Sequence, residues 1–569
     1  MKYFLSLIIL FGFYAKINAQ ESDAGKLYSF ISQYQADIGS LERRYQAKYS
    51  PEYFERMKKF YADWLDKLGK INYNELNVSE SVDYILLKRN IRNDFTVLKE
   101  SEKLYNEVSY TVPFSSLIYE FEKTRRFGSV VNGKEIASLF NQLKKEIEKA
   151  EDVVEEKPVM SEFQSKKAVE VVKNLQNVLK ESYSFYYGYD PLFTWWAEQP
   201  FKEVDTVLSS YSEFLAGWKS DDKKLKDDGS GIIGNPIGQE ALIRLLDFEM
   251  IPYSPDELIQ LANKEFAWCD AEMLKASNEM GFGNEWKKAI EKVKNQNVDP
   301  GKQPELIKFL AEEAVQFVEA NKLLTVPDLA KEDWGMTMMT PKQQLYNPFF
   351  LGGEDIQISF PTNTMSQEAK LMSIRGNNIH FSRATVFHEL IPGHHLQMFM
   401  MQRYKPYRWP FETPFWMEGW ALYWEMLLWD KHFQKTPEDR VGALFWRMHR
   451  CARIIFSLSY HTGKWTPQQC IDFLVDRVGH ERANAEAEVR RSFTGGYGPL
   501  YQIAYMLGGL QLKQLHKDLV ESGKMTDLDF HDAILHENSI PIEMVRAELT
   551  NQKPNQDFKT SWKFYGNLK

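Results

Sequence analysis

The chain has 569 residues, and its hydrophobic share of 43% beside 26% charged residues supports a large buried core, which excludes a disordered or fibrous protein. The formal net charge of -9 provides no basic face for nucleic acid, so we expect no nucleic-acid partner. The three cysteines, Cys269, Cys451 and Cys470, are odd in number and far apart, so the sequence implies no disulfide framework.

The N-terminus has the pattern of a cleavable signal peptide. Lys2 precedes an apolar run over residues 3–15, and the small residue Ala19 offers a cleavage site. An uncleaved membrane anchor is the alternative, but the run is shorter than the ~20 residues that span a bilayer. We therefore expect a signal peptide over residues 1–19. The mature protein is expected to be exported, periplasmic or extracellular, with no membrane span.

Helical spacing dominates the rest of the chain. Apolar residues recur at intervals of three and four among lysines and glutamates, as at Ile136, Leu139, Phe140, Leu143 and Ile147. The segments that begin at Ser254 and Thr466 each combine a capping box with proline at the first helical position. We predict helices over most of residues 21–320 and 383–560. The fold class is therefore mainly α, a large helical body.

Two interruptions of this pattern indicate how the chain is organised. Residues 221–238 are charged and then rich in glycine and proline, which predicts an exposed loop between helical blocks. Helical periodicity lapses again over residues 327–361. We predict a single α-helical domain over residues 20–569, with possible lobes at 20–325 and 326–569.

The second interruption contains a short predicted strand. In "DIQISFP" (355–361), Ile356, Ile358 and Phe360 alternate with polar residues before a proline, which is typical of a strand at a sheet edge. Such an edge could hold an extended peptide by backbone pairing. The aromatic run "YSFYYGYDPLFTWW" (183–196) could be a ligand platform, but we expect it to pack in the core.

The stretch "VFHELIPGHHLQ" (386–397) resembles a zinc-binding helix that has been interrupted. Two histidines bind one zinc from an unbroken helix when they stand four residues apart, whereas His394 and His395 follow His388 by six and seven. Pro392 has no N–H to continue the helix, and Gly393 can adopt backbone angles that other residues avoid. A break there would return a later histidine to the metal. His394 needs a bulge of two residues and His395 one of three, so the smaller distortion favours His394.

A second motif supplies carboxylates. The apolar segment "FWMEGWALYWEMLLWD" (415–430) carries Glu418 and Glu425, which are costly to bury without a cationic partner. We predict Glu418 as the third zinc ligand, with Glu425 as a residue that orients a ligand or stabilises the fold. Glu389, beside His388, is the candidate general base. The alternative interpretation is that the histidines of residues 386–397 are ordinary helix or loop residues. Against it, three of the chain's 11 histidines fall within that stretch.

These motifs together resemble a known family. "FHELIPGHHLQ", "MEGWALYWE", "HTGKWTPQQCIDFL" (461–474), "GPLYQIAYMLGG" (498–509) and "PIGQEALIRLL" (236–246) are similar to the bacterial "domain of unknown function 885" family, grouped with zinc metallopeptidases of the His-Glu-x-x-His clan. The resemblance implies an all-α body with a deep active-site cleft. It also implies His388, His394 and Glu418 as ligands and Glu389 as the base.

The sequence departs from this family at two positions. Ser457 stands where an aspartate is expected, four residues before His461, and Ser492 stands where a tyrosine would follow Arg491. The predicted ligands are unaffected. We expect the departures to affect the part of the cleft that binds substrate.

These observations predict an exported, zinc-dependent metallopeptidase that acts on peptides. A water molecule activated by zinc would attack the carbonyl, with Glu389 as the base. A nearby donor would stabilise the oxyanion, and Tyr505, Tyr501, His461 and Arg491 are the candidates. One alternative is a secreted, non-catalytic protein that binds a peptide or glycan on a decayed enzyme fold. Another is a zinc hydrolase of a non-peptide ester or amide.

Overall fold

The computed structural model of the chain describes residues 25–219 and 227–566. The predicted signal peptide, residues 1–19, lies outside these ranges. The N-terminal helices are α1 (Lys26–Arg44), α2 (Pro51–Gly69), η1 (Tyr73–Glu75), α3 (Val78–Val108), η2 (Ser109–Thr111), α4 (Ser115–Arg126), α5 (Gly133–Glu155), α6 (Glu162–Tyr186) and α7 (Pro191–Gly217).

The remaining elements follow residue 227. They are α8 (Gln239–Phe248), α9 (Pro255–Glu279), α10 (Trp286–Lys294), α11 (Gln303–Ala320), α12 (Asp328–Asp333), β1 (Gly335–Met338), α13 (Pro341–Gln344), β2 (Asp355–Ile358), α14 (Gln367–Gly376), α15 (Ile379–Glu389), α16 (His394–Met401), η4 (Pro406–Phe411), α17 (Pro414–Asp430), α18 (Pro437–His461), α19 (Pro467–Phe473), η5 (Leu474–Val478), α20 (Arg482–Thr494), α21 (Tyr501–His516), η6 (Lys517–Glu521), α22 (Asp527–His536) and α23 (Ile542–Leu549). The prediction of a mainly α fold is confirmed.

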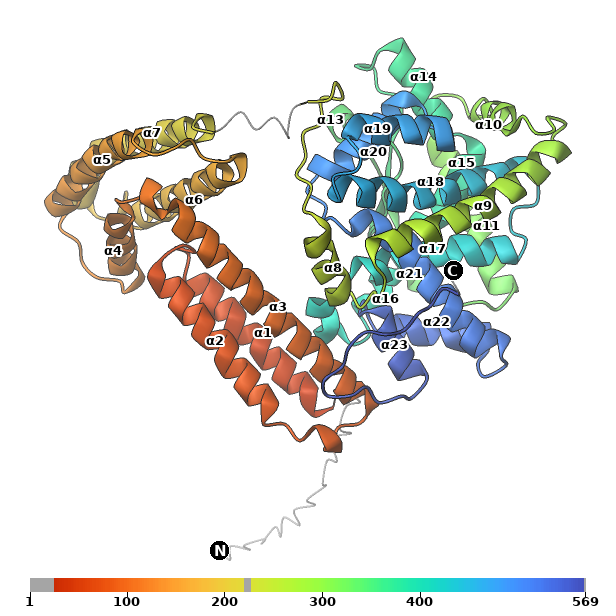
Figure 1. Cartoon of the computed structure of the whole chain (residues 1–569), viewed down its shortest axis with the longest axis horizontal. Helices are drawn as coiled ribbons and strands as arrows, with labels where there is room; N and C mark the ends of the chain where they lie inside the picture. The colour runs from red at the N-terminus through yellow and green to blue at the C-terminus, as the bar shows by residue number, and fades with distance from the viewer. Residues whose placement is uncertain (1–24, 220–226, 567–569) are drawn as a thin grey trace, which may run out of the picture.

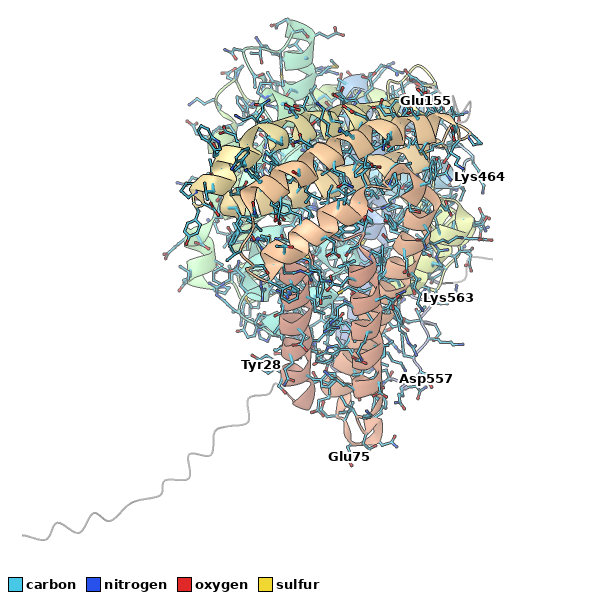
Figure 2. All side chains as sticks on the ribbon, turned by 90° about the vertical axis from the view of Figure 1, so that its left-hand side faces the viewer. Tyr28, Glu75, Glu155, Lys464, Asp557 and Lys563 are labelled. Carbon is cyan, nitrogen blue, oxygen red and sulfur yellow. The ribbon has the colours of Figure 1, made fainter. Side chains whose placement is uncertain are left out.

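The helices form an arm and a body. Figure 1 shows α1–α7 as an arm along one side of a body built from α8–α23. In Figure 2 the arm faces the viewer, with Glu75 at its lower end and Glu155 near its upper end. Within the body α9 packs on α18 and α11 on α15, so the packing changes between α7 and α8, upstream of the suggested lobe boundary at residue 325. The division into lobes stays a prediction.

Local sequence accounts for many of the helix boundaries. Ser254 and Thr466 form the expected capping boxes with Glu257 and Gln469, and both helices have proline in the first turn. The stripe predicted around Phe140 is the buried face of α5, which packs against α7. No described helix is long and apolar enough to cross a membrane.

A buried arginine joins the arm to the body. The Arg408 side chain of η4 is fully buried, and its Nε lies 2.7 Å from Asp83 Oδ1 of α3. Its Nη2 lies 2.6 Å from Glu548 Oε1 of α23. Because removing one partner of a buried ion pair leaves an uncompensated charge, these contacts hold the arm firmly at this point.

The predicted strand is present as β2, but its backbone is not free for a peptide at Gln357. β2 pairs in parallel with β1, and Ile356 and Ile358 are buried against α11 and α15. On the other side, Gln357 N donates to Leu351 O at 2.8 Å, and Leu351 N donates to Gln357 O at 3.1 Å. The predicted pairing of a peptide along residues 356–360 is therefore not available at Gln357, because Leu351 already uses those backbone groups.

The aromatic run over residues 183–196 divides between core and surface. Tyr183, Tyr186 and Phe193 are buried in the arm, as core packing requires. Tyr189 and Trp195 in contrast are 86% and 80% exposed. The expectation of core packing therefore holds for only part of the run, which lies in the arm and does not line the cavity described below.

Candidate metal centre

The histidine motif lies on two helices separated by a short break. α15 ends at Glu389 and α16 begins at His394. Across the break, Gly393 N donates to Phe387 O at 3.0 Å and Leu396 N approaches Leu390 O at 3.4 Å. Both contacts join residues six positions apart, whereas the hydrogen bonds of an α-helix join residues four positions apart. The chain thus contains a two-residue insertion, and the predicted break is confirmed.

Glycine is required at position 393 by a close approach of the backbone. A Cβ there would lie 1.8 Å from His388 O, so no other residue fits without a shift. Pro392 has no backbone N–H and so cannot donate one of the hydrogen bonds that would continue the helix. Its carbonyl accepts a hydrogen bond of 2.8 Å from Trp420 Nε1 of α17. The break is therefore set by local chemistry and held by the neighbouring helix.

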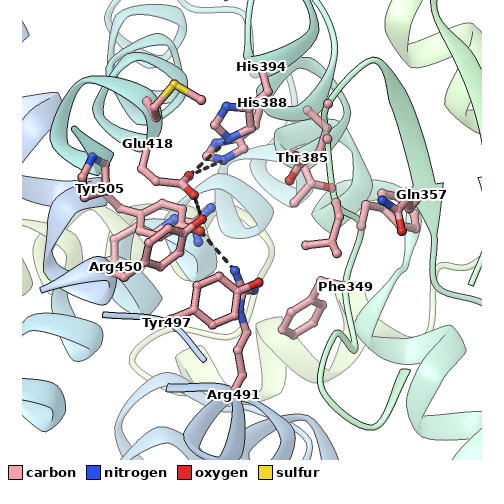
Figure 3. A pocket seen from close by; sticks show the side chains of 18 of the residues that line it. Phe349, Gln357, Thr385, His388, His394, Glu418, Arg450, Arg491, Tyr497 and Tyr505 are labelled. Atoms are coloured by element: carbon pink, nitrogen blue, oxygen red, sulfur yellow. Dashed lines mark hydrogen bonds and ion pairs between the residues drawn. The ribbon is translucent and has the colours of Figure 1, made fainter. Parts of the chain in front are cut away.

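His388, His394 and Glu418 converge on one point, and we name them the cavity group. His394 Nε2 lies 3.2 Å from Glu418 Oε2, and His388 Nε2 lies 3.9 Å from the same oxygen. One ligand atom from each residue lies within 4.8 Å of the others. Figure 3 shows the two imidazoles facing the carboxylate from above. The structure therefore brings the three predicted ligands together.

Neighbouring side chains orient both imidazoles. His388 Nδ1 lies 2.7 Å from Glu425 Oε1. His394 Nδ1 lies 3.3 Å from Gln397 Oε1, whose amide nitrogen donates to the carbonyls of Trp416 and Met417. Because each Nδ1 faces Glu425 or Gln397, each Nε2 points toward Glu418, where it is free to coordinate a cation. This is the arrangement in which protein imidazoles usually bind metals.

His395 does not belong to this group. Its Nδ1 lies 3.0 Å from Glu354 O and its Nε2 lies 2.9 Å from Ala330 O. The side chain is buried and packs between α12 and the start of β2. Of the two histidines that the sequence left open, His394 is the one that faces Glu418.

Glu418 reaches the histidines because α17 and α21 cross closely. A Cβ on Gly419 would lie 2.5 Å from Gly508 Cα, so only glycine allows this approach. The crossing brings two tyrosines of α21 to the site: Tyr501 donates a hydrogen bond to Glu418 Oε1. The ring of Tyr505 stacks on His388 with centroids 6.1 Å apart.

The electrostatics of the cavity group favour positive charge between the histidines and Glu418. Burial alone would lower the pKa of His394, but the Glu418 carboxylate overcomes it and raises this pKa to about 9. Burial alone would raise the pKa of Glu418, but His394, His388 and the Tyr501 hydrogen bond hold it well below its usual range. A buried site that stabilises a proton in this way is suited to a cation.

The group opens on a cavity of about 520 Å³. Glu389 lines it beside His388, is only 8% exposed, and has a pKa raised by burial. A Cβ on Gly352 would lie 2.4 Å from Glu389 Oε2, so bare backbone approaches this carboxylate. Other lining residues are Phe349, Gln357, Thr385, Arg450, Arg453, Arg491, Tyr497, Tyr501 and Tyr505, most of which Figure 3 draws.

Of the four predicted donors, three line the cavity and one does not. Tyr505, Tyr501 and Arg491 are at its wall. His461 lies at the end of α18, where its ring faces Tyr460 and Phe493 at centroid distances of 5.2 and 6.0 Å. Both its nitrogens are buried without a partner among the described residues. His461 is therefore not among the residues that line the cavity, and its role in catalysis stays a prediction.

Sequence reasoning missed three residues at the site. Gln397 follows His394 by three positions on α16, a spacing that places two side chains on one helical face. Arg450 and Arg453 have the same spacing on α18 and both line the cavity. The spacings were visible in the sequence, but nothing local showed which helix each face would meet. At the two departures, Ser457 Oγ approaches Pro499 O at 3.5 Å and Ser492 Oγ bonds to Glu488 O, so neither hydroxyl joins the cavity group.

Comparisons with known proteins show the family and the fold. A structure described as "a putative lipoprotein of unknown function from Shewanella oneidensis" has a TM-score of 0.67 and 17% identity, covering 93% of this chain and 100% of that chain. A second, "the putative lipoprotein from Colwellia psychrerythraea", has a TM-score of 0.55 and 15% identity, covering 92% and 97%. No curated protein sequence matches.

These descriptions name no activity, so the resemblance to zinc metallopeptidases stays a prediction. The family described as "Bacterial protein of unknown function (DUF885)" matches residues 33–549. This range includes both helices of the histidine motif and the helix that carries Glu418. Because the match extends over most of the sequence, this chain belongs to the bacterial family DUF885.

Proposed function

We propose that the chain is an exported, zinc-dependent peptidase in which His388, His394 and Glu418 hold the metal. The observation that carries this proposal is the convergence of two imidazole Nε2 atoms and one carboxylate oxygen beside a buried glutamate in a cavity. Two nitrogens and one oxygen are a common ligand set of catalytic zinc, which keeps its fourth position open.

The spacing of the ligand atoms supports this assignment. Two ligands bound to a tetrahedral zinc at 2.0–2.1 Å lie about 3.3 Å apart. The distances from Glu418 Oε2 to the two Nε2 atoms are 3.2 and 3.9 Å, so small side-chain movements suffice. Glu425 and Gln397 would keep the imidazoles in the required tautomer.

The residues around the group have distinct roles in peptide hydrolysis. Zinc would supply Lewis acidity that lowers the pKa of a water molecule and polarises the scissile carbonyl. Glu389 accepts a proton from the attacking water and passes it to the leaving amine as the C–O bond forms and the C–N bond breaks. Its burial favours this exchange because desolvation raises its pKa toward that of a general base.

Tyr505 is our choice as the donor to the oxyanion. Its ring lies against His388, and it is 4% exposed at the cavity wall. Burial and the nearby Glu418 raise its pKa to about 12, which keeps the O–H available as a donor at neutral pH. Tyr501 is less suited because its hydroxyl already binds Glu418 and so orients a ligand.

Export and a peptide substrate complete the proposal. The apolar N-terminal run has the pattern of a signal peptide. The two similar structures are each described with the words "putative lipoprotein", a class of exported protein, and this supports export. The cavity, at about 520 Å³, has the size of a small-ligand site and accommodates a short stretch of peptide.

The test is a digest of a peptide library by zinc-loaded protein, read by mass spectrometry, with the variant Glu389→Gln. We expect cleavage by the parent, and a loss of about 10²- to 10⁴-fold in kcat for Glu389→Gln with zinc retained. Glu412→Gln is the matched control, because Glu412 lines the same cavity but is largely exposed. A zinc-free parent, or a Glu389→Gln variant as active as the parent, would contradict the proposal. Zinc without peptide cleavage would favour an ester or non-peptide amide.

A further inference from the structure

Three arginines gather in the wall of the cavity, and only two of them have carboxylate partners. Arg450 of α18 lies 3.3 Å from Glu425 Oε1, and Arg453 of the same helix donates to Glu488 Oε1 at 2.7 Å. Arg491 of α20 has no carboxylate within ion-pair distance among the described residues. The wall thus carries one positive charge more than its ion pairs balance.

The groups in direct contact with Arg491 are aromatic and not carboxylates. Its guanidinium lies 4.6 Å from the Tyr497 ring centroid, and its Nη2 lies 3.5 Å from the Tyr505 hydroxyl. The residue is 6% exposed, and its Nε has no hydrogen-bond partner among the described residues. Glu488, one turn away on α20, is already bonded to Arg453. Glu488 is near enough to raise the pKa of Arg491 but does not contact it. A buried guanidinium with no carboxylate in contact is costly, so its presence at a cavity wall favours an anionic ligand.

The position of Arg491 relative to the cavity group defines where that anion would bind. Figure 3 shows Arg491 on the opposite side of the cavity from the two histidines, with Tyr497 beside it. Tyr505 links the two sides, because its hydroxyl faces Arg491 while its ring stacks on His388. The anion would therefore bind beside Arg491, with the Tyr505 side chain between it and the cavity group.

We infer that Arg491 binds the free α-carboxylate of a peptide, so that the chain removes residues from C-terminal ends. This inference rests on the proposed function. A guanidinium matches a carboxylate with two parallel hydrogen bonds. In any peptide with a free end, only one nitrogen and one α-carbon separate the last peptide carbonyl from the terminal carboxylate. Anchoring that carboxylate at Arg491 selects the last peptide bond for attack at the cavity group.

The test compares matched N-acetylated peptides that end in a free carboxylate or in a carboxamide. Zinc-loaded parent should cleave the last bond of the acid form with a kcat/KM roughly 100-fold above that of the amide form. Arg491→Gln should remove this preference by lowering kcat/KM for the acid form alone. Arg490→Gln, the neighbouring arginine outside the cavity, should keep it. An oxyanion role for Arg491 would instead lower both forms equally and overturn the inference.

Other outcomes separate this inference from the proposed function. Equal cleavage of the two forms by the parent overturns the carboxylate site and leaves a peptidase. Absence of any cleavage contradicts the peptidase. Binding of both forms to zinc-loaded Glu389→Gln, measured by calorimetry, then still decides the carboxylate site: tighter binding of the acid supports it and equal binding overturns it. Because Arg491 has no carboxylate partner, Arg491→Gln should melt no lower than the parent.

Discussion

Within residues 25–219 and 227–566, two groups of two histidines and one acid have the spacing of metal ligands. They differ in whether their nitrogen and oxygen atoms already have hydrogen-bond partners in the protein. The first is the cavity group. The second, which we name the α21–α22 group, consists of His516, Asp527 and His531, and its ligand atoms also lie within 4.8 Å of one another. By composition and spacing alone, both could hold a metal.

In the α21–α22 group the protein already satisfies the polar atoms. His531 Nδ1 donates to Leu323 O at 2.7 Å, and its Nε2 lies 2.8 Å from the Tyr423 hydroxyl. Asp527 accepts from His516 Nε2 at 2.7 Å and from Lys431 Nζ at 2.9 Å. A metal ion there would have to displace these bonds beside a lysine cation. In the cavity group the two Nε2 atoms instead converge on one carboxylate oxygen.

The two groups also respond oppositely to charge. Glu418 raises the pKa of His394 to about 9, whereas burial lowers the pKa of His531 to about 3. The His394 side chain is 12% exposed and His531 is fully buried, and burial alone would lower both pKa values, so it does not account for the opposite shifts. The acid faces His394 directly, whereas His531 has Tyr423 and a carbonyl as its partners. Residue type and proximity are therefore insufficient evidence for a metal site.

The largest expected effect is on zinc content. The parent should bind one zinc per chain, and His394→Ala should lose nearly all of it, because a site with two remaining ligands holds zinc poorly. His395→Ala should keep the metal, because His395 faces two backbone carbonyls. Metal analysis of the purified variants checks this. The reverse result would show that the break in the motif presents His395 to the zinc.

A smaller loss of zinc affinity is expected when Glu425 no longer orients His388. Glu425→Gln should weaken zinc binding by about 10- to 100-fold, since residues that orient metal ligands usually contribute this much. Glu418→Gln should weaken it far more. Competition with a zinc chelator measures both. If Glu425→Gln is the more severe change, then Glu425 and not Glu418 is the ligand.

The α21–α22 group should affect stability and not metal content. His531→Ala removes two buried hydrogen bonds, and we expect the free energy of unfolding to fall by about 2–3 kcal/mol. Zinc should remain at one per chain. Urea unfolding and metal analysis test the two statements separately. A parent with two zinc ions, reduced to one by His531→Ala, would erase the distinction between the groups.

The smallest effect concerns His461, another buried imidazole in surroundings that disfavour charge. Burial lowers its pKa from the usual 6.5 to about 4. Between about pH 6.5 and pH 4 the unfolded chain binds a proton at His461 that the folded chain does not. The free energy of unfolding therefore decreases as the pH is lowered through this range. The loss from this residue should be about 1 kcal/mol at pH 6.

His461→Leu should remove this contribution. The free energy of unfolding of parent and variant, compared at pH 8 and pH 6, gives the difference directly. Turnover should not change, because His461 does not line the cavity. A variant with impaired turnover and normal folding would restore His461 as a candidate for the site.

Local sequence was sufficient to predict the helical class, several helix starts and the break in the histidine motif. The break follows from the chemistry of two adjacent residues, because Pro392 has no N–H and a side chain at Gly393 would collide with His388 O. That Glu418 meets buried partners was also predicted from its own helix, since a carboxylate on so apolar a segment needs one.

Only the tertiary structure decided which side chains face the cavity. His461 and Arg491 were equivalent candidates in the sequence, yet Arg491 lies in the cavity wall and His461 packs against Phe493. The position of Tyr505 depends on the crossing of α17 and α21 at Gly419 and Gly508. Backbone chemistry acts between neighbours in the chain and is visible in the sequence. Contacts between distant helices depend on how all their faces pack together, which no single segment specifies.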